Sequence, residues 1–110
     1  MTPEQARRVL GLVGLGIRSR NAVVGVEQVR FAAKKGTLAL ALVASDASVN
    51  SLDKVVPLLK ARRIRVIEGL TVAQLGAVAG RTQTAAIGVV DRPLARGILG
   101  AMESGPSRPT

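Results

Sequence analysis

The sequence predicts a single α/β domain, a three-layer α/β/α sandwich with a mostly parallel sheet of roughly four strands. Its 110 residues are enough for one hydrophobic core. Helical apolar periodicity alternates along the chain with short β-branched or continuous apolar runs, and capping or turn residues mark most boundaries. Strands that alternate with helices imply crossover connections, and therefore parallel neighbours covered by helices on both faces.

The first helix and the first strand are marked by local chemistry. Thr2 and Gln5 form a capping box around Pro3, which suits the first helical position, and the helical pattern extends over residues 2–20. Residues 22–24, "AVV", are β-branched and precede a glycine, which predicts a brief strand.

The middle of the chain predicts a second helix, a buried strand and a helix that contains a proline. The second helix covers residues 26–35 and ends at Gly36, a residue suited to the left-handed C-terminal position. The continuous apolar run at 37–45 is typical of a central strand covered on both faces. Pro57 disrupts a helix interior, so the third helix either starts near this proline or is kinked there.

The last part of the domain repeats the alternation. Residues 64–69 and 85–91 predict strands, and residues 70–80 and 92–102 predict the helices that follow them. The capping box and hydrophobic staple of the earlier helix are formed by Thr71, Gln74, Leu70 and Leu75. The domain is thus expected to span residues 1–102. Residues 103–110, rich in Pro, Gly and Ser, are expected to form a disordered tail.

Composition argues for a binding protein. Sixteen Lys and Arg against seven Asp and Glu give a net charge of +9, which attracts polyanions and favours a nucleic acid or an anionic membrane as partner. A charge that serves only solubility is the alternative. No apolar run approaches the length of a bilayer span, so we expect no membrane segment. The absence of Cys fits a reducing compartment, and we expect a cytoplasmic protein.

Catalytic residue types are scarce. The chain has no Cys, no Tyr and no His, so we expect no metal, no cofactor and no enzymatic activity. A hydrolase with paired carboxylates at Asp46, Glu68 or Asp91 stays open, although no spacing favours it.

Four stretches together resemble one protein family. They are "VLGLVGLGIRSRNAVVGVEQV", "ALALVASDAS", "VVPLLKARRIRVI" and "LTVAQLGAVAGRTQTAAIGVVD", and they cover nearly the whole chain in order. They resemble the kink-turn-binding ribosomal proteins of the large subunit, of the "seven-Ae" and "thirty-e" type, and in particular the small bacterial YlxQ-like members. The resemblance implies a non-enzymatic protein that binds structured RNA, with ribosomal RNA and ribosomal proteins as expected partners.

The resemblance places RNA recognition at the start of the second helix. The family motif Gly-x-Asn-Glu-x-x-Lys falls on Gly25, Glu27, Gln28 and Phe31. The helix N-terminus would bind phosphate, and the carboxylate and amide would contact guanine edges opened by a bent RNA. Two positions depart from the motif: Asn-Glu is replaced by Glu-Gln, and the lysine is replaced by Phe31, so that Arg30 or Lys34 takes over its phosphate contact or Phe31 stacks on a base.

Further patches are expected to converge on the Gly25 end of this helix. They are the turn 18–21, the loop 81–84 and, with weaker support, the loop 45–47. The basic run Lys60, Arg62, Arg63 and Arg65 is interpreted as a solvated face. The predicted RNA-binding residues are Arg18, Arg20, Asn21, Gly25, Glu27, Gln28, Arg30, Phe31, Lys34, Arg81, Thr82 and Gln83.

A purely structural interpretation of the second helix stays open. In it Val26, Val29 and Ala33 face the core, Glu27 suits the helix dipole, and Phe31 packs against the first helix. The corresponding alternative for function is a protein-interaction adaptor on the same scaffold, without a specific RNA site.

Overall fold

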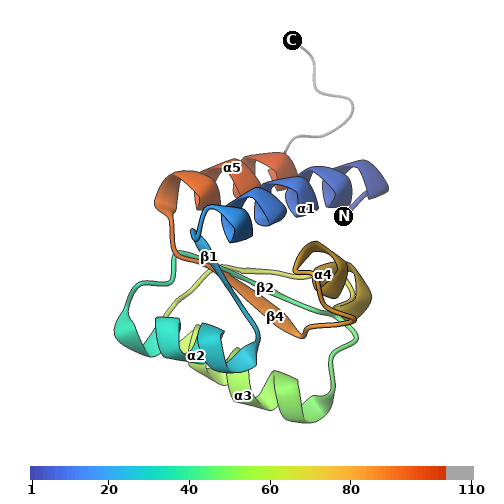
Figure 1. Cartoon of the computed structure of the whole chain (residues 1–110). Helices are drawn as coiled ribbons and strands as arrows, with labels where there is room; N and C mark the ends of the chain where they lie inside the picture. Colours follow the sequence, from blue (N-terminus) through green and yellow to red (C-terminus); the bar gives the residue numbers. More distant parts are fainter. Residues whose placement is uncertain (104–110) are drawn as a thin grey trace.

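The structure, a computed structural model, describes residues 1–103, which form five helices and four strands (Figure 1). Within these residues no helix is long and apolar enough to cross a membrane. In chain order the elements are α1 (Pro3–Arg18), β1 (Ala22–Val24), α2 (Val26–Lys35), β2 (Leu40–Val43), α3 (Val49–Ala61), β3 (Val66–Ile67), α4 (Val72–Val78), β4 (Ala86–Val89) and α5 (Arg92–Glu103).

The sheet corrects the predicted strand directions. Its order is β1-β4-β2-β3; β2 and β3 are parallel, whereas β4 is antiparallel to both β1 and β2. The first three strands therefore point the same way, as the alternation predicts, but β4 is inserted in reverse between β1 and β2. The cause is the connection from β3, because the seven-residue α4 is only about 10 Å long and does not carry the chain back along the sheet.

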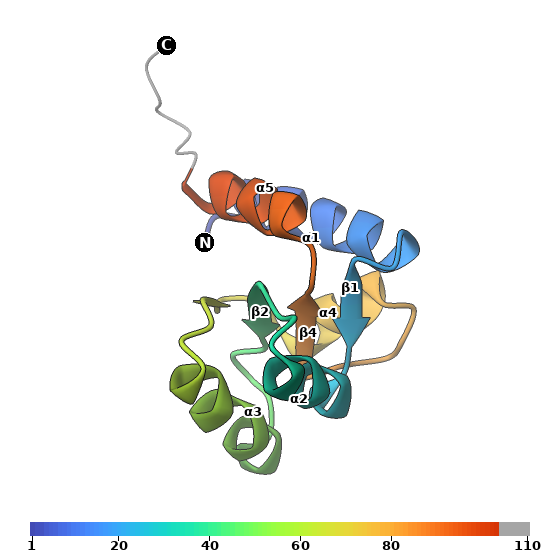
Figure 2. The same ribbon diagram turned by 90° about the vertical axis from the view of Figure 1, so that its left-hand side faces the viewer.

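Helices cover both faces of the sheet, which agrees with the predicted layers. In Figure 2 the sheet lies between α1 and α5 on one side and α2 and α3 on the other, with α4 on the α1 side. Alternation along β2 builds the two cores, because Leu40 and Leu42 face the α1–α5 layer while Ala41 and Val43 face the α2–α3 layer. The domain thus has two apolar cores that share one central sheet.

Local capping signals agree with the structure. The Thr2 hydroxyl accepts from the Gln5 amide at 3.1 Å, and the Thr71 hydroxyl accepts from the Gln74 amide at 3.1 Å, so both predicted capping boxes are present. Helix α2 ends as predicted at Gly36, whose φ of 82° lies in the left-handed region.

Several boundaries differ from the prediction, and β3 and β4 are shorter than the predicted strands at 64–69 and 85–91. Helix α3 starts at Val49, where Ser48 caps it, and continues through the exposed Pro57, so the start near this proline is wrong. The central strand is shorter than predicted, because only residues 40–43 pair in the sheet. Glu103 is the last residue of α5, and the rest of the expected disordered tail, 104–110, lies outside the described residues.

Candidate nucleic-acid interface

Gly25 joins the end of β1 to the start of α2 and holds the backbone in a geometry that favours glycine. Its φ is 100° and its ψ is 157°, and its N–H donates to the Ala86 carbonyl at 2.9 Å. Within residues 1–103 no side chain caps the helix, so the N–H groups of its first turn have no side-chain acceptor there. This end of α2 therefore presents the positive end of a helix dipole to an incoming anion.

Arg81 reaches the same place from a distant part of the sequence. Its Nη1 lies 3.7 Å from the point that a Cβ on Gly25 would occupy, so the guanidinium lies beside the exposed helix start. The backbone N–H of Arg81 donates to the Gly76 carbonyl at 2.8 Å. The structure thus brings the loop 81–84 and the start of α2 together, as the sequence predicts.

The loop 81–84 is held tightly against α4. A Cβ on Gly76 would lie 2.4 Å from the Cα of Gln83, so only glycine allows this approach. The buried Thr84 donates its N–H to the Val72 carbonyl at 3.1 Å. Because both ends of the loop are fixed, Thr82 and Gln83 stay exposed at a defined position.

The β2–α3 loop completes this end of the molecule. The carboxylate of Asp46 accepts the Val72 N–H at 2.8 Å, which ties the loop to the start of α4. A cavity of about 400 Å³ lies between this loop and Gln83. All these segments meet where β1, β2 and β3 end, the edge at which open α/β sheets usually bind ligands. We call this surface, formed by residues 25–28, 45–48 and 81–84, the strand-end edge.

Glu27 and Gln28 are both exposed on the first turn of α2, but Glu27 has basic neighbours. Its carboxylate lies 4.0 Å from the Arg30 Nε and 4.0 Å from the Lys54 Nζ. Arg30 also donates from Nη1 to the Lys54 carbonyl at 2.6 Å, so its guanidinium is held against α3. Lys54 was not among the predicted residues, because only the packing of α2 on α3 brings it next to Glu27.

Phe31 projects into solvent. Its side chain is 63% exposed, and the Lys35 ammonium lies 5.6 Å from the ring centroid. The interpretation in which Phe31 packs against the first helix is wrong, because α1 and α2 lie on opposite faces of the sheet (Figure 2). The exposed Lys34 follows on the same helix, with no ion-pair partner among residues 1–103.

The turn 18–21 leads into the start of β1, at the other end of this strand from Gly25. Arg18 Nη1 lies 3.5 Å from the Cβ position of Gly14, which α4 also approaches through Val78, so this guanidinium points toward α4. Asn21 is bonded instead to Val90, at the far end of β4 from Ala86. The expected convergence with Gly25 is therefore wrong for Arg20 and Asn21, because β1 runs between them and the helix start.

The fold and the strand-end edge define a small α/β/α sandwich with a glycine-headed helix and an arginine-bearing loop at one end. Solved structures share this fold, and two of them are compared with this chain. A protein of unknown function from Bacillus halodurans matches with a TM-score of 0.79 and 28% identity, over 88% of this chain and 98% of that chain. The Giardia lamblia 15.5 kD RNA-binding protein matches with a TM-score of 0.77 and 14% identity, over 92% of this chain and 87% of that chain. No family model matches the sequence, and neither does any curated protein.

Replacing Gly25 by alanine is expected to destabilise the protein by about 1–3 kcal/mol, because the new side chain forces an unfavourable backbone conformation at a φ of 100°. Urea unfolding followed by circular dichroism measures the change. Gly11→Ala is the matched control, because Gly11 lies inside α1 and its added Cβ would meet no neighbouring atom within 4 Å. This variant is expected to stabilise the protein by about 0.5–1 kcal/mol. Equal effects of the two substitutions would contradict a conformational role for Gly25.

Proposed function

We propose that the protein is a non-enzymatic, cytoplasmic RNA-binding protein that recognises kink-turn-like RNA through the strand-end edge and associates with the ribosome. The observation that carries the proposal is the Arg81 guanidinium beside the uncapped N-terminus of α2. Two independent sources of positive potential meet there, with the polar side chains of Glu27, Gln28 and Gln83 beside them.

The chemistry of this edge suits a distorted RNA. The helix N-terminus and Arg81 would hold phosphates, which positions the protein but carries no sequence information. The exposed Glu27 and Gln28 offer a carboxylate and an amide for base edges, and these are accessible only where the RNA is bent or unpaired. The similarity of the fold to the Giardia RNA-binding protein supports the same class of ligand.

Gel-shift titrations test the proposal with a kink-turn RNA and a plain duplex of equal length. We expect tighter binding to the kink-turn and a steep salt dependence, because each neutralised phosphate contributes roughly 0.7 to 0.9 to the log–log slope. Equal affinity for both RNAs would exclude kink-turn recognition, and a shallow salt dependence would exclude phosphate contacts altogether. Cofractionation with ribosomes in sucrose gradients tests the association with the ribosome.

Exchanging Glu27 and Gln28 together for alanine is expected to reduce the preference for the kink-turn by at least about tenfold, since each lost base contact is worth about 1–3 kcal/mol of discrimination. Binding to the plain duplex should not weaken, because no positively charged side chain is lost. Gel shifts on both RNAs measure the ratio of affinities. The control replaces Asn50 and Asp53, which are exposed on α3, and should leave that ratio unchanged.

The exposed Phe31 favours a second candidate function, a protein-interaction adaptor without a specific RNA site. A large apolar side chain that is 63% exposed beside Lys35 is a plausible contact for a protein surface. The absorbance at 260 nm per mole of purified protein distinguishes the two functions, because a chain with one Phe and no Trp or Tyr absorbs very weakly there and bound RNA absorbs strongly. An absorbance no higher than that of one Phe and the peptide backbone would favour the adaptor.

A further inference from the structure

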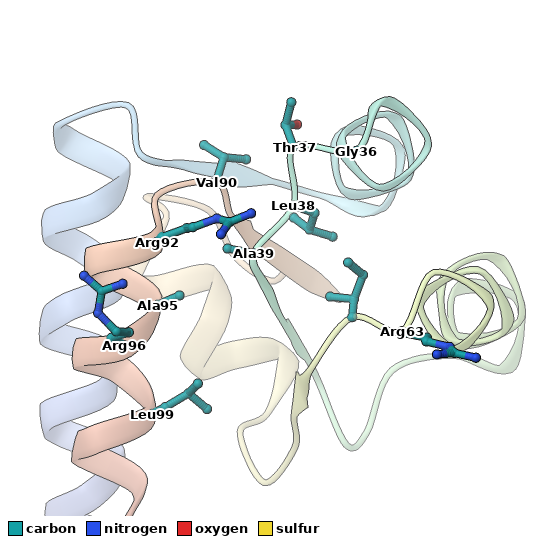
Figure 3. Close-up of a pocket in the computed structure, with 11 residues that line it drawn as sticks. Gly36, Thr37, Leu38, Ala39, Arg63, Val90, Arg92, Ala95, Arg96 and Leu99 are labelled. Atoms are coloured by element: carbon teal, nitrogen blue, oxygen red, sulfur yellow. The ribbon is translucent and has the colours of Figure 1, made fainter.

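A second surface lies at the opposite end of the sheet from the strand-end edge. It is a groove of about 580 Å³ between the first turns of α5, the entry to β2 and the segment after α3 (Figure 3). Strand β4 connects the two ends, because Ala86 is bonded to Gly25 whereas Val90 lines the groove. The residues that line the groove are Gly36, Thr37, Leu38, Ala39, Arg63, Ile64, Val90, Arg92, Ala95, Arg96 and Leu99.

The groove has an aliphatic floor. Leu38 and Ala95 are almost fully buried there, and Ile64, Val90 and Leu99 are half-buried around them. Some of these side chains belong to one hydrophobic core and some to the other, so the groove lies where the edges of the two cores meet at the end of the sheet. It contains no aromatic ring, since the chain's only aromatic residue is Phe31 on α2.

Three exposed arginines line the groove beside this floor, and none of the acidic residues within 1–103 does. Figure 3 shows Arg92 reaching from α5 across to Ala39, whereas Arg96 points outward from α5 and Arg63 points outward on the α3 side. None of the three has an ion-pair partner within the described residues 1–103. The nearest carboxylate in sequence, that of Asp91, is already engaged because it accepts the Leu94 N–H at 2.9 Å.

We propose that this groove binds an acidic, aliphatic segment of a partner protein, so that the chain connects RNA at one end of the sheet to a protein at the other. Arginine forks form paired, charge-assisted hydrogen bonds with carboxylates, which matches the three unpartnered side chains around the groove. Leucine- or isoleucine-sized side chains between those carboxylates would cover the aliphatic floor and remove it from water.

Two other occupants fit the groove less well. RNA would satisfy the arginines through its phosphates, but it would leave the aliphatic floor uncovered, and no ring is present on which a base could stack. The chain's own residues 104–110 include Arg108 but no Asp or Glu, so they offer no acidic side chain to these arginines. An acidic and aliphatic protein segment matches both the charge and the floor.

Fluorescence anisotropy tests the proposal on the full chain, with a labelled synthetic peptide in which glutamate alternates with leucine as the probe. The double variant Arg92→Gln and Arg96→Gln is expected to weaken peptide binding at least about tenfold, since one charged hydrogen bond is worth roughly that factor. The matched control is Arg7→Gln and Arg8→Gln in α1, which removes the same charge far from the groove and should have little effect. Leu99→Ala, checked for folding by circular dichroism, should also weaken peptide binding, because it removes part of the aliphatic floor that the leucine side chains of the peptide would cover.

Three outcomes would overturn the proposal. The first is that the groove variant and the control variant lose the same affinity for the peptide. The second is that a peptide with glutamine in place of glutamate binds equally well. The third is that single-stranded RNA displaces the peptide in a way that depends on Arg92 and Arg96. The last result would assign the groove to RNA. Binding of kink-turn RNA to the groove variant should match that of the control variant, so failure at the groove can be distinguished from failure of the proposed function at the strand-end edge.

Discussion

Replacing Gly76 by alanine is expected to destabilise the protein by about 3 kcal/mol and to weaken RNA binding as well. The added Cβ would lie 2.4 Å from the Cα of Gln83 and 2.6 Å from its backbone nitrogen, so backbone rather than a flexible side chain must move. Overpacking of this kind costs roughly 1–3 kcal/mol, and a clash with backbone belongs at the upper end. The loop 81–84 must then move away from α4, which displaces Arg81 from the start of α2.

Urea unfolding and gel shifts on the kink-turn RNA measure the two effects of Gly76→Ala. Gly97→Ala is the matched control, because Gly97 is also inside a helix but its Cβ would meet only Leu12 at 3.9 Å, an ordinary contact. That variant is expected to be at least as stable as the original and to bind RNA equally well. A Gly76 variant with unchanged stability would show that the loop is not held as the structure describes.

The features that the sequence predicts correctly depend on local chemistry. The capping box of Thr71 and Gln74 involves residues three positions apart, so it is readable without the fold. The turn at Gly36 and the helix start at Gly25 follow from the conformational freedom of glycine in the same way. The direction of β4 is different, because it depends on where the chain re-enters the sheet after α4, and the apolar pattern of residues 86–89 is the same for either direction.

In the candidate site, too, the features set by neighbouring residues are predicted correctly, and the features set by the fold are not. Gly25, Glu27 and Gln28 are neighbours in sequence and lie together at the start of α2, as predicted. Arg20 and Asn21 are also close to Gly25 in sequence, but an extended strand of three residues spans about 10 Å and places them at the opposite end of the sheet. Proximity along the chain therefore indicates a shared surface within a helical turn but not across a strand.

Contacts between helices were the least predictable part of the site. Arg30 was a candidate to replace the lysine of the family motif, yet its guanidinium donates to the Lys54 carbonyl on the neighbouring α3. Lys54 approaches Glu27 for the same reason. Both contacts follow from the packing of α2 beside α3 over the same face of the sheet, and no spacing within either helix encodes that geometry.

Replacing Arg81 by alanine is expected to weaken the binding of kink-turn RNA and of plain duplex alike, by roughly 10- to 100-fold, the range for one hydrogen bond to a charged group. The slope of log affinity against log salt should fall by about 0.7 to 0.9, which corresponds to one phosphate. Arg62→Ala removes the same charge at the C-terminal end of α3, away from the strand-end edge, and serves as the control.

Comparing Arg81→Ala with the Arg62→Ala control distinguishes a direct contact between Arg81 and a phosphate from the general attraction of RNA by the positive charge of the protein. The exposed Arg81 side chain has no ion-pair partner within residues 1–103, so its removal leaves no charge unpaired in the fold, and stability should change little. A loss of affinity that matches the Arg62 variant would mean that only the net charge of +9 attracts RNA. A larger loss with a reduced salt slope would place a phosphate beside the start of α2. Because that phosphate contact is common to both RNAs, the preference for the kink-turn should survive in the Arg81 variant and be reduced only by substitutions at Glu27 and Gln28.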